Sequence, residues 1–248
     1  MLRVSAVQFH TEKDPTENLR KAELFVEQEA RRSDLIVFPE YFLESPAGMA
    51  PAIIKRFREL AKRHKIDIVP GSMLTERRGR RYNTSHYIDS KGRILSRYDK
   101  ATPWKTESVT AGGFPKPFRS RFGKTAIVVC WDLANPLISA HLSKLGVDLI
   151  VCPSSWWEGG EFKPERRFAG EFVDSLCISR SYESQAWLVY ANKAGVIHLK
   201  GFSDPSAGRT QVVEPMAKPV VAQGRTQQVV RCNFERKRLE AARRYYRG

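Results

Sequence analysis

The chain has 248 residues, of which 42% are hydrophobic and 28% are charged. These proportions are typical of a folded globular protein and exclude the low hydrophobicity of a disordered chain. The formal net charge is +15. The basic residues are dispersed and no zinc-finger or RNA-binding motif accompanies them, which favours a solvated basic surface over a nucleic-acid site.

Neither a membrane span nor a metal site is predicted. No apolar stretch approaches the roughly 20 residues needed to cross a bilayer. The N-terminus runs directly into a strand-like segment that lacks the regions of a signal peptide, so we expect a cytoplasmic protein. The cysteines at 130, 152, 177 and 232 are far apart and lack a nearby histidine cluster. This spacing favours reduced thiols over zinc ligands.

The opening of the chain predicts a strand followed by an amphipathic helix. Residues 2–9 have the composition of a strand. Asp14 and Pro15 then supply an N-cap and a proline at the first helical position. Apolar residues recur after them at helical spacing, so the helix is expected to end near Arg32.

The next segments predict a layered arrangement of strands and helices. The continuous apolar run at 35–38 is typical of a strand buried on both faces. A second helix is expected from Pro51, and a strand follows at 66–71. Segments 81–89 and 94–100 are separated by a short turn, which predicts a hairpin and therefore a mixed sheet. The alternation of strands and helices indicates an α/β fold.

The second half of the chain continues this alternation. Apolar runs at 125–130, 147–152 and 186–191 are separated by helical stretches near 135–145 and 165–184. Three β-rich segments follow between Arg209 and Phe234, and a short charged helix is expected to close the chain. No internal repeat or linker divides the sequence. We therefore expect a single domain, 1–248, with a basic C-terminal segment from about residue 235.

Three reactive side chains lie at the ends of predicted strands. Glu40 follows LIVFP, Lys100 ends ILSRYDK and Cys130 ends TAIVVC. Functional groups gather at such positions in layered α/β folds. Taken singly, each has another interpretation: a capping acid, a solvated lysine and a small core thiol. The combination is more informative than any one of them.

The segments around these residues resemble the three catalytic motifs of the nitrilase superfamily. They are DLIVFPE (34–40), SRYDKATPW (96–104) and VVCWDLANP (128–136), in the order of that family. The resemblance extends over nearly the whole chain. It implies an α-β-β-α sandwich with mixed sheets, and a catalytic glutamate, lysine and cysteine at Glu40, Lys100 and Cys130.

The implied activity is hydrolysis of a non-peptide carbon–nitrogen bond, first of all in a small amide. Cys130 would form a thioester acyl-enzyme and release ammonia or an amine, with Glu40 moving protons. Lys100 and the backbone N–H of Trp131 would stabilise the oxyanion, without any cofactor. N-carbamoyl compounds and nitriles are alternative substrates. A non-catalytic scaffold or nucleic-acid-associated protein that uses the basic surface is an alternative of another class.

Two acidic residues and two departures from the family pattern complete the motifs. Glu107 resembles the family's second glutamate, which helps to position substrate and catalytic groups, although an exposed loop acid would look the same. Asp132 resembles the acid of the family's C-x-D motif, where a structural role is expected. Thr102 and Asn135 stand where family members often have His and Arg. These departures affect the substrate class more than the mechanism.

Several aromatic residues are candidates for the substrate pocket. Trp156 and Trp157 follow the strand at 147–152, and Trp104 and Tyr41 follow the catalytic lysine and glutamate motifs. Together with Trp131 they could line an apolar or aromatic acyl pocket, although ordinary core aromatics would give the same pattern. The family commonly assembles through helices near the nucleophile, so the resemblance also implies a homodimer or larger homo-oligomer.

Overall fold

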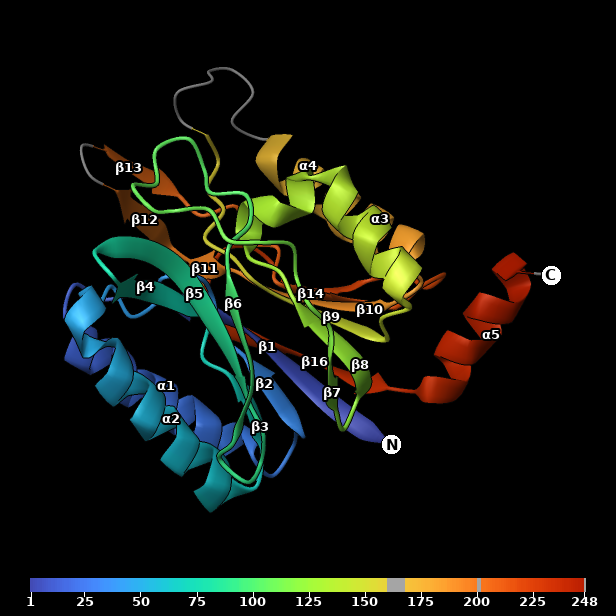
Figure 1. Ribbon diagram of the computed structural model, residues 1–248, viewed down its shortest axis with the longest axis horizontal. Helices are drawn as coiled ribbons and strands as arrows, with labels where there is room; N and C mark the ends of the chain where they lie inside the picture. Colours follow the sequence, from blue (N-terminus) through green and yellow to red (C-terminus); the bar gives the residue numbers. More distant parts are fainter. Residues whose placement is uncertain (160–167, 200–201, 248) are drawn as a thin grey trace.

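Two β-sheets pack face to face, and each is covered on its outer side by a pair of helices (Figure 1). The structure is a computed structural model that describes residues 1–159, 168–199 and 202–247. This arrangement confirms the predicted α-β-β-α sandwich with mixed sheets.

Eight described strands form the first sheet, in the order β11-β1-β2-β3-β5-β4, with β16 paired to β1 and β6 paired to β5. β1, β2 and β3 run parallel to one another, whereas β5, β6 and β16 add antiparallel pairs. The strands are β1 Leu2–His10, β2 Leu35–Val37, β3 Asp67–Val69, β4 Ser72–Arg77, β5 Arg80–Ile88, β6 Ile94–Asp99, β11 Lys193–Ala194 and β16 Gln228–Phe234.

The second sheet has the order β15-β14-β10-β9-β8-β7 among the described strands. Its central strands β8, β9 and β10 are parallel, and its outer strands pair antiparallel. The strands are β7 Phe118–Ser120, β8 Gly123–Ile127, β9 Leu149–Pro153, β10 Trp187–Ala191, β14 Gln211–Val213 and β15 Val220–Val221. A separate two-stranded ribbon joins β12 Val196–Leu199 to β13 Phe202–Pro205.

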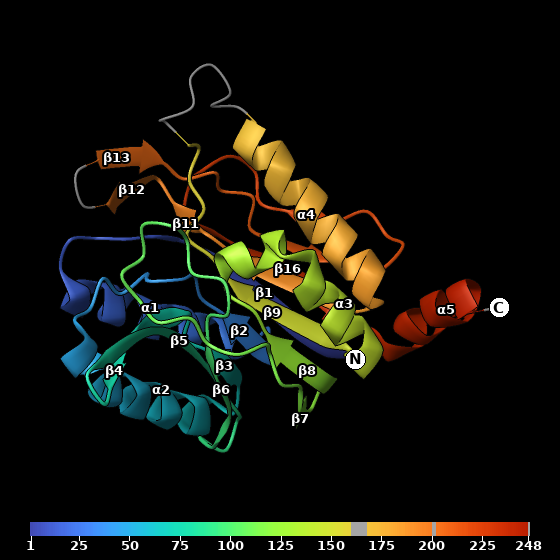
Figure 2. The ribbon, with the colours of Figure 1, turned by 45° about the horizontal axis from the view of Figure 1, so that its top comes forward.

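The helices cover the outer faces of the sandwich. α1 and α2 lie on the first sheet and α3 and α4 lie on the second, while α5 extends from the body at the C-terminus (Figures 1 and 2). They span α1 Pro15–Glu29, α2 Ala50–His64, α3 Pro136–Leu145, α4 Phe168–Ser184 and α5 Arg236–Arg247, with 3-10 turns η1 Ala47–Met49 and η2 Cys130–Ala134. No helix in the described ranges is long and apolar enough to cross a membrane.

Two apolar clusters hold the layers together. One lies between the sheets and continues under α3 and α4, where it includes Val128, Leu142 and Trp187. The other lies between the first sheet and the α1–α2 pair, where Phe38 and Phe42 stack with ring centroids 5.0 Å apart. Burial of these side chains supplies the main driving force for folding.

The predicted elements are present, with differences at their ends. The helix expected to end near Arg32 ends at Glu29, and α4 begins at Phe168, so the expected residues 165–167 lie outside the described ranges. The strand that leads to Cys130 ends at Ile127. The short strands β4, β7, β11, β12 and β13 were not predicted.

Candidate active site

Cys130 is the first residue of η2, at a sharp turn that follows β8. Its backbone is in the left-handed region, with φ of 47°, which is strained for a residue with a side chain. Asp132 holds this turn: its Oδ2 accepts hydrogen bonds from the Val129 N–H at 2.9 Å and the Tyr98 hydroxyl at 2.8 Å. Its Oδ1 accepts from the Thr102 N–H at 2.8 Å. The carboxylate therefore connects the cysteine turn to the segment that follows β6.

Lys100 is buried between two carboxylates. Its Nζ donates to Glu40 Oε1 at 2.9 Å and to Glu107 Oε2 at 2.6 Å. Asn83 of β5 donates from Nδ2 to the same two residues, at 2.7 Å to Glu40 and 3.0 Å to Glu107. Only 2% of the Lys100 side chain and 3% of the Glu40 side chain is exposed. This geometry fixes the ammonium group and both carboxylates in one arrangement.

The pKa values of Lys100 and Cys130 are both raised, which favours the charged form of the lysine and the neutral form of the thiol. Burial lowers the pKa of Lys100, but the charges of Glu40 and Glu107 and the hydrogen bond to Glu107 raise it above its usual value. Burial raises the pKa of the Cys130 thiol and the charge of Glu40 raises it further, against the opposing effect of Lys100. The resting site therefore holds an ammonium group and a protonated thiol, which needs a base before it can act as a nucleophile.

A cavity of about 430 Å³ opens onto these groups, and its walls are mainly aromatic. Trp131 is central: its ring centroid lies 4.3 Å from that of Trp104 and 5.2 Å from that of Trp156. Trp157 contacts Trp104, and Phe172 contacts Trp156. The cavity is thus polar at its catalytic end and apolar along its walls.

Every residue predicted for the site lines this cavity. They are Glu40, Tyr41, Lys100, Trp104, Glu107, Cys130, Trp131, Trp156 and Trp157. Trp156 and Trp157 belong to the segment PSSWWEGG (153–160), expected to form the substrate-binding loop, and its last residue, Gly160, lies outside the described residues. The fold brings the predicted site residues, which are remote from one another in the sequence, together around one cavity. Their catalytic and binding roles stay predictions.

The sequence did not identify several further residues of the site. Asn83 bridges Glu40 and Glu107, and Phe168 and Phe172 of α4 extend the aromatic wall. A signal for Asn83 was present, because asparagine is depleted in strands and this one interrupts the predicted segment 81–89. No comparable signal marks the phenylalanines, which fit an ordinary amphipathic helix.

The two departures from the family pattern contact each other. Asn135 Nδ2 donates to Thr102 Oγ1 at 3.2 Å, and the Asn135 side chain also caps α3 through the Leu137 N–H. Two neutral side chains therefore connect the lysine segment with the turn after the nucleophile. Neither adds a cation to that edge of the site.

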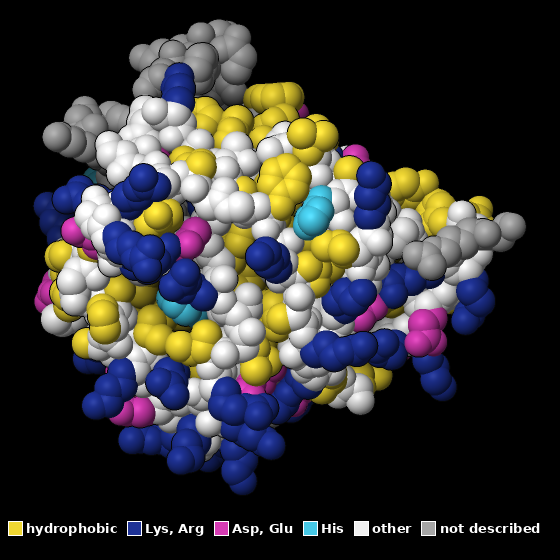
Figure 3. Space-filling model, viewed as in Figure 1, with side chains coloured by type: hydrophobic (Ala, Val, Ile, Leu, Met, Phe, Trp, Pro, Cys, Tyr) yellow, Lys and Arg dark blue, Asp and Glu magenta, His cyan; other side chains and the backbone are white. Residues whose placement is uncertain are grey.

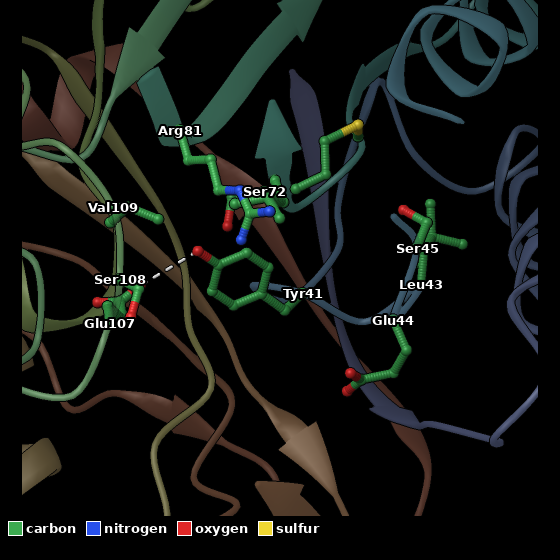
Figure 4. A pocket seen from close by; sticks show the side chains of 11 residues that line it. Tyr41, Leu43, Glu44, Ser45, Ser72, Arg81, Glu107, Ser108 and Val109 are labelled. Atoms are coloured by element: carbon green, nitrogen blue, oxygen red, sulfur yellow. Dashed lines mark hydrogen bonds between the residues drawn. The ribbon is translucent and has the colours of Figure 1, made fainter. Parts of the chain in front are cut away.

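Tyr41 lies beside the charged cluster at the rim of the cavity. Its hydroxyl donates to Glu107 Oε1 at 3.2 Å, as the dashed line in Figure 4 shows. Burial and the neighbouring charges of Glu107 and Glu40 raise the pKa of its phenol, so it serves as a neutral donor. Among the described residues, no group of three or more His, Cys, Asp or Glu side chains is placed to hold a metal ion.

Fold and site together define an α-β-β-α hydrolase of the nitrilase type, with a cysteine, a glutamate and a lysine facing one cavity. The chain belongs to the carbon–nitrogen hydrolase family, which matches residues 3–244. This membership confirms the resemblance seen in the sequence motifs and the expectation that the protein is a hydrolase.

Similar proteins include enzymes from several bacteria. The chain is 26% identical over 238 residues to 2-oxoglutaramate amidase of Bacillus subtilis, covering 89% of this chain and 85% of that one. It is similar in fold to a carbon–nitrogen hydrolase from Helicobacter pylori, with a TM-score of 0.88, 17% identity and coverage of 99% and 93%. A glutamate-to-glutamine mutant of an amidase from Nesterenkonia sp. AN1, with the acetamide moiety of fluoroacetamide added covalently at its active-site cysteine, has a TM-score of 0.81, 19% identity and coverage of 99% and 94%.

Proposed function

We propose that this protein is an amidase that hydrolyses small neutral amides through a thioester on Cys130. The observation that carries the proposal is the Lys100 ammonium, held by Glu40 and Glu107 in the cavity that Cys130 also lines. A buried cation fixed next to a thiol and a carboxylate supplies the three groups that acyl transfer requires.

In the first step Glu40 accepts the thiol proton and the Cys130 sulfur attacks the amide carbon. The carbonyl oxygen becomes an oxyanion, which the Lys100 ammonium and the Trp131 N–H stabilise. Trp131 is in the first turn of η2, where backbone N–H groups lack helical acceptors. Glu40 then gives its proton to the nitrogen as the carbon–nitrogen bond breaks, and ammonia leaves.

In the second step water hydrolyses the thioester. Glu40, now ionised, accepts a proton from the water as its oxygen attacks the acyl carbon. Collapse of this intermediate breaks the carbon–sulfur bond and releases the carboxylic acid. The proton returns to the sulfur, and the resting thiol is restored.

Glu107 is assigned a positioning role. It accepts hydrogen bonds from Lys100, Asn83, Tyr41 and the Trp104 N–H. These contacts commit both of its oxygens, whereas Glu40 has one oxygen that bonds Lys100 and Asn83. Glu40 is therefore the carboxylate better placed to move protons.

The walls favour an apolar or aromatic acyl group. Trp104, Trp131, Trp156 and Phe172 surround the space beyond the sulfur. Lys100 is the one cation among the described residues that line the cavity, and two carboxylates already neutralise it. Among these described lining residues, an acyl group that carries its own carboxylate would find no unpaired cation, so we assign neutral amides as substrates.

Release of ammonia from a set of amides tests the proposal. Phenylacetamide and butyramide should be hydrolysed faster than 2-oxoglutaramate, benzonitrile or an N-carbamoyl amino acid. Mass spectrometry should find the matching acyl adduct on Cys130, and Cys130→Ala should have no turnover while it keeps its fold. Turnover by Cys130→Ala would refute the mechanism, whereas preference for 2-oxoglutaramate would refute only the substrate class.

A further inference from the structure

A second cavity, of about 270 Å³, lies beside the catalytic one. It shares Tyr41 and Glu107 with the catalytic cavity, but neither Cys130 nor Lys100 lines it. Figure 4 shows Tyr41 between the loop at 107–109 and the segment at 43–45, with the Arg81 side chain reaching over its ring. The tyrosine therefore lies where the two cavities adjoin.

Arg81 is the cation among the described residues that line this cavity. No described carboxylate lies within ion-pair distance of its guanidinium. The two acids in the lining are already paired: Glu44 with Lys193, and Glu107 with Lys100. The uncommitted charge that faces this cavity is therefore positive.

Two hydroxyl groups at the same place also lack partners. The Oγ atoms of Ser72 and Ser45 are buried and have no hydrogen-bond partner among the described residues, and both serines line the cavity. Ser72 is almost fully buried, with 1% of the residue exposed. A buried hydroxyl without a partner is costly, so such groups are usually satisfied by water or a ligand.

We propose that this cavity is a binding site for a small carboxylate, separate from the site of hydrolysis. A carboxylate offers a planar pair of acceptors that matches the donor fork of a guanidinium, and its oxygens can also accept from hydroxyl groups. Arg81 would provide the fork, and the serine hydroxyls would provide further donors. The inference does not depend on the proposed amidase activity.

The test is a calorimetric titration of the protein with malonate at neutral pH and low ionic strength. Arg81→Gln should weaken malonate binding by about tenfold or more, since a charge-assisted bidentate contact is lost. Arg80→Gln is the matched control, because Arg80 is the preceding residue of β5 but lines a different surface pocket. It removes the same charge and should leave the affinity within about twofold.

Alkylation of Cys130 with iodoacetamide separates the two cavities. The adduct blocks the catalytic cavity and should leave malonate binding unchanged. Loss of binding on alkylation would place malonate in the catalytic cavity and overturn the proposal. Equal weakening by Arg80→Gln and Arg81→Gln would also overturn it, because the effect would then come from general charge. If malonate did not bind to the unmodified protein, the proposal would also be overturned.

Discussion

Lys100 is an ammonium group with 2% of its side chain exposed, and its burial is tolerated because two carboxylates contact it. Such a group is costly to remove alone, since the partners are left buried and unpaired. In Lys100→Met we expect the free energy of unfolding to fall by about 3–5 kcal/mol. We also expect kcat to fall by about 10²–10³-fold or more, because an oxyanion donor is lost. Denaturant unfolding and steady-state turnover measure the two effects.

A second variant separates stability from catalysis at this position. Lys100→Met combined with Glu40→Gln removes one of the two unpaired charges, so part of the lost stability should return while turnover stays absent. If the double variant lost as much unfolding free energy as the two single variants lose together, the ion pair would not be the source of the stability loss.

The Cys130 thiol gives a prediction in which reactivity and turnover change in opposite directions. Burial raises its pKa, and the charge of Glu40 raises it further. Glu40→Gln removes that charge, so the pKa of the thiol should fall and more thiolate should be present at neutral pH. Alkylation by iodoacetamide should become faster, while amide turnover should be lost with the proton shuttle. Slower alkylation would show instead that Glu40 activates the thiol towards both reagents.

At the scale of elements, Asp132 joins the cysteine turn to the end of β6. It accepts hydrogen bonds from Val129, Tyr98 and Thr102. Asp132→Asn keeps the shape but turns one acceptor into a donor that faces other donors. We expect a loss of about 2–3 kcal/mol in unfolding free energy, measured by denaturant, and lower kcat. Tyr98→Phe removes a single donor and should lower the free energy of unfolding by less. An unchanged free energy of unfolding in Asp132→Asn would contradict this structural role.

His86 on β5 gives a pH dependence. Burial lowers its pKa to about 4, and the nearby charge of Arg97 contributes, compared with about 6.5 in an unfolded chain. Between these values the unfolded state binds more protons, so the stabilising effect is full above pH 6.5 and is lost as the pH falls towards 4. The folded state should lose about 3 kcal/mol across this window because of His86 alone.

The measurement for His86 compares two pH profiles of unfolding free energy. Carboxylates titrate in the same window, so the wild type is set against His86→Gln, which lacks the imidazole. The wild-type curve should fall more steeply below pH 6.5. Parallel curves would mean that His86 is protonated in the folded protein without penalty.

The sequence predicted the long elements and the motif residues, because both depend on local patterns. Apolar periodicity identified α1 and α2, and proline with an N-cap located the start of α1. The edge strand β4 was missed because it is buried only at its start and ends in the charged residues Glu76 and Arg77, which hides the alternation of a strand. The turn at Cys130 was also missed, since its left-handed backbone depends on contacts from Asp132 rather than on local propensity.

The candidate site was predictable only as far as its motifs extend. Glu40, Lys100 and Cys130 could be identified from three short segments, but the aromatic wall depends on how α4 packs against the loop at 153–159. Phe172 contacts Trp156 only in the folded chain. Spatial contacts between segments this far apart in the sequence have no local pattern, so Phe172 and Phe168 could not be assigned to the site beforehand.

For the whole molecule, we propose a single domain that includes the basic C-terminal helix. α5 packs on the body through buried Leu239 and Ala242, and Arg243 bonds Asp148 at 2.7 Å. The lower part of the view in Figure 3 is covered mainly by Lys and Arg side chains. That this charge forms a solvated surface and not a nucleic-acid site stays a prediction from the sequence.

The outer face of α3, α4 and α5 leads us to propose a homodimer. Leu137, Ile178 and Tyr245 are 64%, 46% and 74% exposed, and apolar side chains gather over α3 and α4 in Figure 3. The rings of Tyr182 and Tyr246 join α4 to α5 at 4.7 Å. Exposed apolar side chains gathered on one face are typical of an interface. Analytical ultracentrifugation at micromolar concentration should therefore find a dimer.

Ile178→Glu tests the face directly, because a carboxylate buried against its symmetry mate is costly in a two-fold interface. The variant should sediment as a monomer at concentrations where the wild type is dimeric. Leu24→Glu on α1 is the matched control, since Leu24 is also exposed, at 42%, but lies on the opposite outer face of the sandwich. It should leave the dimer intact. A monomeric wild type would rule out an interface at α3–α4. Equal dissociation by both variants would also rule it out, because the effect of a new charge would then not depend on where it is placed.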